Sequence, residues 1–133
     1  MKHPRSTLFS TSALLLLFCF CSPQSEKSET LFVKHLAQKS GITFQNDLTE
    51  GPNTNVLMYE YFYNGGGVAL ADFNGDQRLD IYLTSNMQTN KMYLNQGDFQ
   101  FQDITALSKT EGRSGPWKTG VTAVDINGDS RMD

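Results

Sequence analysis

Short apolar segments separated by turn residues dominate the chain beyond Tyr59. Between residues 68 and 104 there are four such segments, each with the alternation or the composition that is typical of a β-strand. They contain Val68 and Leu70, residues 81–84, Met92 and Leu94, and Phe99 and Phe101. Residues 95–98, Asn-Gln-Gly-Asp, favour a tight hairpin turn because Asn and Gly accept positive φ. We therefore predict one antiparallel meander of four strands.

The segment ahead of these strands, residues 31–63, has a mixed pattern. Its apolar residues from Leu31 to Leu36, followed by Gly41, fit a short capped helix, whereas residues 41–44 fit a strand. We expect His35 to be exposed or bonded locally, because no second histidine, cysteine or carboxylate cluster lies at metal-ligand spacing from it. Residues 31–63 are therefore interpreted as a lead-in to the strands.

The first 30 residues are predicted to direct the chain to secretion and then to tether it. Residues 1–20 belong to a secretion signal peptide, with a basic start and an apolar run from Ala13 to Cys21 that gives way to polar residues. This run is too short for the roughly 30 Å of bilayer hydrocarbon, which takes about 20 residues. Residues 22–30 contain no large apolar side chain, so we expect a flexible tether there.

A lipid anchor is expected at the end of the apolar run. Cys19 and Cys21 lie where the chain changes from apolar to polar, and a cysteine at this place resembles the signal of bacterial lipoproteins. We take Cys21 as the acylated residue, although Phe20 stands where such signals usually have a small residue. Acylation of Cys19 and an ordinary cleaved signal are the alternatives. Residues 21–30 would then tether the chain, through its lipid, to the outer membrane or the cell surface.

The composition describes an ordinary water-facing globular chain. Of the 133 residues, 38% are hydrophobic and 19% are charged, which excludes a membrane bundle and a wholly disordered chain. The formal net charge of -3 gives no support for a nucleic-acid partner. Beyond residue 30 the sequence has no cysteine, so disulfides cannot stabilise the folded part.

A repeat is the most informative feature of the sequence. Residues 67–80, GVALADFNGDQRLD, return as residues 120–133, GVTAVDINGDSRMD, at an offset of 53 residues and with eight of 14 positions identical. One four-stranded sheet per period is typical of a β-propeller blade. The predicted fold class is therefore all-β, with blade repeats over residues 64–133. We expect one complete blade and the start of a second, truncated at Asp133.

Each copy contains the loop Asp-x-Asn-Gly-Asp-x-x-x-Asp, which places side-chain oxygens at positions 1, 3, 5 and 9. Calcium prefers such ligands, taking six to eight oxygens at about 2.3–2.6 Å, and a main-chain carbonyl near position 7 can supply another. Zinc is disfavoured because neither loop contains a histidine or a cysteine, and magnesium is disfavoured because it gives up its bound water reluctantly. The predicted calcium ligands are Asp72, Asn74, Asp76, Asp80 and the carbonyl of Arg78 in the first loop, and Asp125, Asn127, Asp129, Asp133 and the carbonyl of Arg131 in the second.

Other interpretations of these motifs fit less well. An EF-hand loop requires a carboxylate at position 12, where this chain has Leu83, and helices where the flanks favour strands. An acidic turn held by Asx-type hydrogen bonds is the structural alternative. Glycines 65–67 are not followed by the lysine of a phosphate loop, and we expect them to let a strand approach a crowded neighbour. No Ser-His-Asp or Cys-His set is present, so no enzyme activity is predicted.

The two loops and the residues before them resemble FG-GAP or VCBS-type repeats, as in integrin α-subunit propellers, over about residues 64–133. More narrowly, residues 61–69, 80–82, 92–95 and 101–105 are similar to secreted bacterial lipoproteins that share repeats with cartilage acidic protein and often end in an ASPIC/UnbV domain. The resemblance implies a calcium-bearing propeller of about seven blades outside the cytoplasm, used for adhesion or for binding a protein or glycan ligand.

One position departs from the family pattern. Position 6 of the loop, usually glycine, is Gln77 in the first copy and Ser130 in the second. If this position takes a positive φ, a side chain there costs on the order of 1 kcal/mol.

Three functions follow as hypotheses. We favour a lipid-anchored, non-enzymatic module for binding or adhesion. The alternatives are a propeller domain of a secreted hydrolase whose catalytic part is missing from this chain, and a scaffold with a purely architectural role. Because the chain stops at the ninth position of its second loop, we interpret it as a partial gene product, and further sequence would separate the three hypotheses.

Overall fold

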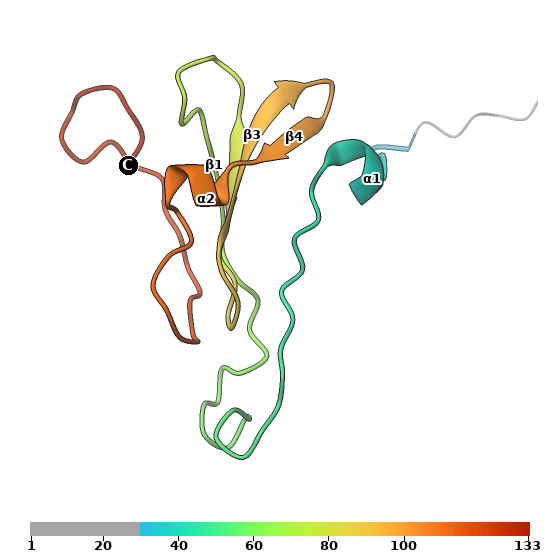
Figure 1. The fold of residues 1–133 in the computed structure, drawn as a ribbon, viewed down its shortest axis with the longest axis vertical. Helices are drawn as coiled ribbons and strands as arrows, with labels where there is room; N and C mark the ends of the chain where they lie inside the picture. The colour runs from blue at the N-terminus through green and yellow to red at the C-terminus, as the bar shows by residue number, and fades with distance from the viewer. Residues whose placement is uncertain (1–29) are drawn as a thin grey trace, which may run out of the picture. The chain divides into compact units, whose positions relative to one another are not determined.

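A single four-stranded sheet forms the centre of the fold in the computed structural model (Figure 1), which describes residues 30–133. Its strands follow one another in the order β1-β2-β3-β4, and each pairs with the next in antiparallel fashion. The sheet therefore confirms the predicted meander. The strands are β1 (Val68–Ala71), β2 (Asp80–Leu83), β3 (Lys91–Gly97) and β4 (Gln100–Asp103).

The predicted signal peptide and lipid anchor, including Cys19 and Cys21, lie outside the described residues. Val33–Asp133 forms one compact unit, which contains all the helices and strands assigned in the described part of the chain. No helix among the described residues is long and apolar enough to cross a bilayer.

The hairpin between β3 and β4 turns at Asp98 and Phe99, which have φ of 49° and 56°. Gly97 pairs with Gln100 across this two-residue turn, and positive φ at both central residues is characteristic of a type I′ hairpin. The predictions that the turn lies at residues 95–98 and that Phe99 is a strand residue were therefore wrong. An irregularity in the ladder between Asn95 and Gly97 lengthens β3 and moves the turn along the chain.

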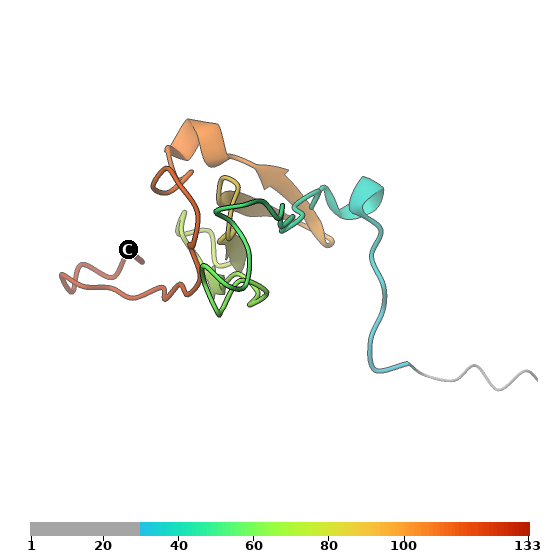
Figure 2. The same cartoon turned by 90° about the horizontal axis from the view of Figure 1, so that it is seen from below.

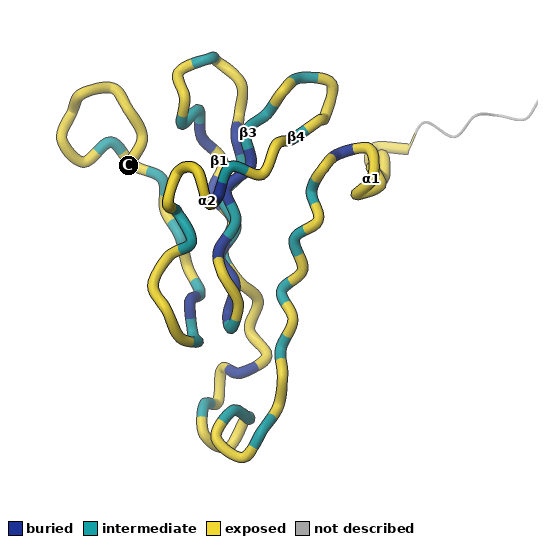
Figure 3. The backbone as a smooth tube through the Cα atoms, in the orientation of Figure 1, coloured by how far each residue is buried: buried dark blue, intermediate teal, exposed yellow. Residues whose placement is uncertain are grey.

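The lead-in contains one short helix, α1 (Ala37–Ser40), and a long extended segment after it. Gly41 ends the helix with a φ of 77°, as predicted, but the helix begins later than Leu31. Residues 41–44 form no strand, although residues 41–49 alternate between exposed and half-buried positions, visible as changing colours in Figure 3. The strand predicted for residues 41–44 is therefore wrong, because the segment is extended but pairs with no other strand among residues 30–133.

A side-chain contact holds this extended segment to the sheet. The Asn46 Oδ1 accepts hydrogen bonds from the backbone N–H of Asn86, at 2.9 Å, and from the Ser85 hydroxyl, at 3.2 Å. His35 is exposed, as expected, and its ring stacks on Phe99 with 4.6 Å between ring centroids. The lead-in therefore docks through specific polar and aromatic contacts.

The buried part of the sheet is small and unusually polar. Its apolar members are Ala69 and Ala71 of β1 and Met92 and Tyr93 of β3, and Phe62 in the segment before the sheet is also buried. The segment that connects β2 to β3 contains several buried polar residues, and hydrogen bonds satisfy most of their polar groups. The Asn90 amide donates to the Tyr82 hydroxyl at 2.8 Å, and this hydroxyl donates to the Thr110 carbonyl at 2.9 Å. Nearby, the Trp117 ring packs on Tyr59 and Phe62.

Glycines before β1 allow close backbone packing, as predicted for two of the three. A Cβ on Gly66 would overlap the Thr84 carbonyl oxygen, and one on Gly67 would overlap the backbone at Thr119. Gly65 has open space around it. The Thr84 hydroxyl completes the contact, since it accepts from the Gly67 N–H at 2.6 Å and donates to the Thr119 carbonyl at 2.5 Å. The start of the second repeat therefore lies beside the start of β1.

The second repeat forms its loop but not its strand. Residues 120–125 have no assigned strand, so the start of the second repeat consists of an unpaired segment and its loop. The segment meets the sheet through the contacts of Gly67 and Thr84 rather than through a ladder. Figure 2 shows the C-terminal loop projecting to one side of the sheet. One other short helix, α2 (Thr105–Ser108), follows β4 and was not predicted.

Candidate metal centre

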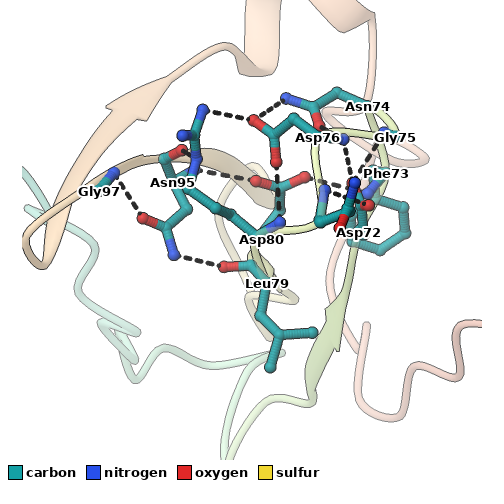
Figure 4. Close-up of polar contacts among 11 residues, drawn as sticks. Asp72, Phe73, Asn74, Gly75, Asp76, Leu79, Asp80, Asn95 and Gly97 are labelled. Atoms are coloured by element: carbon teal, nitrogen blue, oxygen red, sulfur yellow. Dashed lines mark hydrogen bonds and ion pairs between the residues drawn. The ribbon is translucent and has the colours of Figure 1, made fainter.

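The first acidic loop connects β1 to β2 at one end of the sheet (Figure 4). Asp72 follows β1 directly, and Asp80 is the first residue of β2, where it pairs with Ala71. Because two paired strands fix both ends of the loop, its nine residues must wind tightly. The sheet therefore fixes both ends of the loop that carries the predicted ligands at positions 1, 3, 5 and 9.

Backbone N–H groups of the loop turn inward onto these side chains. The two oxygens of Asp72 accept three such bonds, Asn74 accepts one at its amide oxygen and Asp76 accepts one at Oδ1. The donors are Gly75 (2.7 Å), Asp76 (3.0 Å) and Gln77 (2.7 Å) to Asp72, Asp76 (2.9 Å) to Asn74, and Arg78 (2.9 Å) to Asp76. The Asx-type bonds of the structural alternative are thus present. They leave carboxylate lone pairs free, so they are compatible with a metal ligand role.

The second loop repeats this arrangement bond for bond. Its first, third and fifth residues accept the same backbone N–H groups at nearly the same distances. The donors are Gly128 (2.7 Å), Asp129 (3.1 Å) and Ser130 (2.7 Å) to Asp125, Asp129 (3.0 Å) to Asn127, and Arg131 (2.9 Å) to Asp129. The two sequences differ at several positions and lie in different surroundings. The conformation is therefore encoded within the nine residues.

Position 6 takes a positive φ in both loops. Gln77 has a φ of 66° and Ser130 a φ of 68°. Both residues therefore have the positive φ at which a side chain is less favourable than glycine. A left-handed conformation costs a residue with a Cβ roughly 1–2 kcal/mol. Each loop therefore holds one residue that is strained relative to glycine.

The ninth residues of the two loops differ in burial. Asp80 is fully buried, and its two oxygens accept from the backbone N–H groups of Phe73, at 3.0 Å, and Asn95, at 2.9 Å. Asp133 is exposed, and within the described part of the chain its carboxylate accepts only the corresponding Ile126 N–H, at 3.1 Å. Only the first loop is therefore joined to β3 through its last carboxylate.

Asn95 is the residue of this site that the sequence did not identify. The Asn95 backbone N–H donates to Asp80, and its side-chain amide donates to the Leu79 carbonyl at 2.9 Å. The backbone carbonyl of Asn95 accepts from the Arg78 side chain. It lies 15 residues beyond Asp80, and its position opposite the loop depends on the pairing of β2 with β3. No local motif marks such a contact.

The electrostatics keep both loops anionic. The pKa of the Asp76 carboxyl is lowered, first by the hydrogen bond from the Asn74 side chain and then by the Arg78 N–H. The pKa of the Asp125 carboxyl is lowered mainly by the Ser130 N–H, with the Gly128 and Asp129 N–H groups adding to it. Groups whose pKa falls below the usual range stay ionised at neutral pH. The loops therefore concentrate negative charge.

The acidic side chains do not form a closed metal site. Among the described residues, no group of three or more histidine, cysteine or acidic side chains is gathered closely enough to hold an ion. Their oxygens are directed at backbone N–H groups instead. The donor set nevertheless fits calcium in its chemistry, since it consists of carboxylate and amide oxygens only. Cys21, the predicted lipidation site, lies outside the described residues.

The comparison with protein families agrees with the repeat found in the sequence. A family described as FG-GAP-like repeat matches residues 72–133, from the first position of the first loop to the last position of the second. No curated protein and no solved structure matches the chain. Residues 72–133 are thus similar to the FG-GAP-like repeat, and the four-stranded antiparallel sheet is consistent with one blade of a β-propeller.

Proposed function

We propose that this chain is a calcium-binding repeat module that acts outside the cytoplasm in adhesion or in binding a protein or glycan ligand, without enzyme activity of its own. The observation that carries the proposal is the pair of loops with one hydrogen-bond pattern, 53 residues apart in the sequence. Repeated acidic loops within an FG-GAP-like repeat favour a shared ligand over two unrelated turns.

The charge balance supports a cation. Asp80 is fully buried, yet its two hydrogen bonds come from neutral N–H groups and no ion pair includes it among the described residues. Buried charges are normally paired or coordinate a metal. An ion in the loop would also offset the repulsion between Asp72, Asp76 and Asp80. The second loop has the same ligands but a more exposed last carboxylate.

Calcium fits this donor set better than other common ions. It accepts irregular shells of six to eight oxygens, which suits a loop that offers carboxylates, an amide, a carbonyl at position 7 and water. The residues that would hold it are Asp72, Asn74, Asp76, Asp80 and the Arg78 carbonyl, and their equivalents Asp125, Asn127, Asp129, Asp133 and the Arg131 carbonyl. Calcium would neutralise the loops and fix their shape, and so position the surface used for binding.

Two calcium ions per chain are expected in a calorimetric titration of the 133-residue protein. Asp76→Ala and Asp129→Ala should each remove one binding event, because each takes away the carboxylate at position 5. At a free calcium concentration ten times the dissociation constant, each occupied loop should add about 1.4 kcal/mol to the free energy of unfolding. Asp47→Ala, which removes an exposed carboxylate outside the loops, serves as the control. Unchanged stoichiometry in both loop variants would contradict the proposal.

The proposed location depends on the N-terminal cysteines. A diacylglycerol or palmitoyl group on Cys21 would hold the chain at the outer membrane or the cell surface by its tether. In cells fed labelled palmitate, label is expected to disappear with Cys21→Ser and to persist with Cys19→Ser. The reverse result would move the anchor to Cys19, and label in neither the parent chain nor the variants would remove the anchor from the proposal.

A further inference from the structure

An arginine already neutralises part of the first loop. The Arg78 guanidinium donates from Nη2 to the Asp76 Oδ2 at 2.7 Å and from Nε to the Asn95 carbonyl at 3.0 Å. The same Asp76 oxygen also accepts from the Asn74 side-chain amide at 3.0 Å. Asp76 Oδ2 therefore has two donors where a calcium ligand would need a free lone pair.

The second loop lacks this neutralising contact, although it has an arginine at the same position. Arg131 makes the same backbone bond to Asp129, but its side chain has no hydrogen bond or ion pair among the described residues. Within residues 30–133, Asp129 Oδ2 accepts only from the Asn127 side-chain amide, at 3.1 Å. The difference comes from the surroundings, since β3 provides the Asn95 carbonyl that holds Arg78 in place.

We propose that Arg78 is an internal counter-ion that competes with calcium for Asp76, so that the first loop binds calcium more weakly than the second and releases the Arg78 side chain when it does bind. The inference rests on the proposed function. It follows because a divalent ion on either oxygen of Asp76 would lie close to the guanidinium that is bonded to the same carboxylate, and the two cations repel each other.

The expected size of the effect is modest because the pair is partly exposed. The Arg78 and Asp76 side chains are 49% and 27% exposed, and exposed ion pairs of this kind shift an equilibrium by at most about fivefold. The pair is also screened by salt. The difference in calcium affinity between the loops should therefore shrink as the ionic strength rises.

Single-loop variants of the 133-residue chain allow each site to be measured alone. Asp129→Ala leaves the first loop, and Asp76→Ala leaves the second. In the first background, Arg78→Gln should tighten calcium binding by about two- to fivefold in calorimetry at low salt. In the second background, Arg131→Gln removes the same charge from the same loop position and should change the affinity by less than about twofold.

A second readout follows the arginine itself. In the Asp129→Ala chain with Arg78 intact, the Arg78 Nε–H signal in a heteronuclear NMR spectrum should move on calcium addition, because its bonds to Asn95 and Asp76 are lost together. An unmoved signal, or equal effects of the two arginine substitutions while both loops bind calcium, would overturn the inference and leave the proposed function standing. Absence of calcium binding in both single-loop chains would overturn both.

Discussion

Replacing Asp80 with alanine is expected to lower the free energy of unfolding by about 3 kcal/mol in the absence of calcium. The Asp80 carboxylate is fully buried and accepts the N–H groups of Phe73 and Asn95, so it joins the start of the loop to β3. Alanine would leave both N–H groups without their acceptor, at a cost of about 1–3 kcal/mol for each one that water cannot reach. Urea unfolding followed by circular dichroism measures the change.

The second repeat provides a matched control for this prediction. Asp133 occupies the same loop position and accepts the equivalent N–H of Ile126, but it is exposed, so water can take its place. Asp133→Ala should therefore cost less than about 1 kcal/mol. Asp80→Asn, which keeps one acceptor oxygen, should lie between the two alanine variants. Equal effects of Asp80→Ala and Asp133→Ala would show that the bond to Asn95 contributes nothing to stability.

Gly66→Ala is expected to destabilise the fold by about 3 kcal/mol or more. A Cβ at this position would overlap the backbone carbonyl of Thr84, which cannot rotate away as a side chain could. Relief would require β1 to move from the end of β2, and that movement would break the Gly67 N–H bond to the Thr84 hydroxyl. Hydrogen exchange should show the loss directly, as faster exchange of the amides of β1 and β2.

Gly65→Ala separates the packing effect from the general effect of removing a glycine. Nothing lies near a Cβ at Gly65, and its φ is not in the left-handed region. The substitution should leave stability within about 1 kcal/mol of the parent chain. If Gly66→Ala lowered the free energy of unfolding no more than Gly65→Ala does, the close packing of Gly66 against the Thr84 carbonyl would be contradicted.

Features encoded over a few residues were predictable from the sequence. The short apolar segments at Val68–Ala71 and at residues 91–94 identified two strands, although β1 buries Ala69 and Ala71 rather than the predicted Val68 and Leu70. The nine-residue acidic motif determined its own conformation, since both copies fold alike in different surroundings. The sequence therefore revealed the sheet and the candidate ligands together.

Features that depend on contacts distant in the sequence were not predictable. The hydrogen bond from the Asn86 N–H to the Asn46 side chain joins residues 40 positions apart in the sequence. It holds an extended segment that pairs with no strand in the described part of the chain. The β3–β4 turn moved because a ladder irregularity took up one residue, which no local pattern marks. Asn95 and the Arg78 bond to its carbonyl likewise depend on strand pairing. These contacts make the two otherwise similar loops unequal.

A crystal structure of the chain determined in millimolar calcium tests the central claim most directly. The account predicts one ion in each loop, at about 2.3–2.6 Å from carboxylate oxygens of Asp72 and Asp76 and of Asp125 and Asp129. It also predicts that the Arg78 guanidinium has left Asp76. Loops without an ion at that calcium concentration, with Arg78 still bonded to Asp76, would contradict the account.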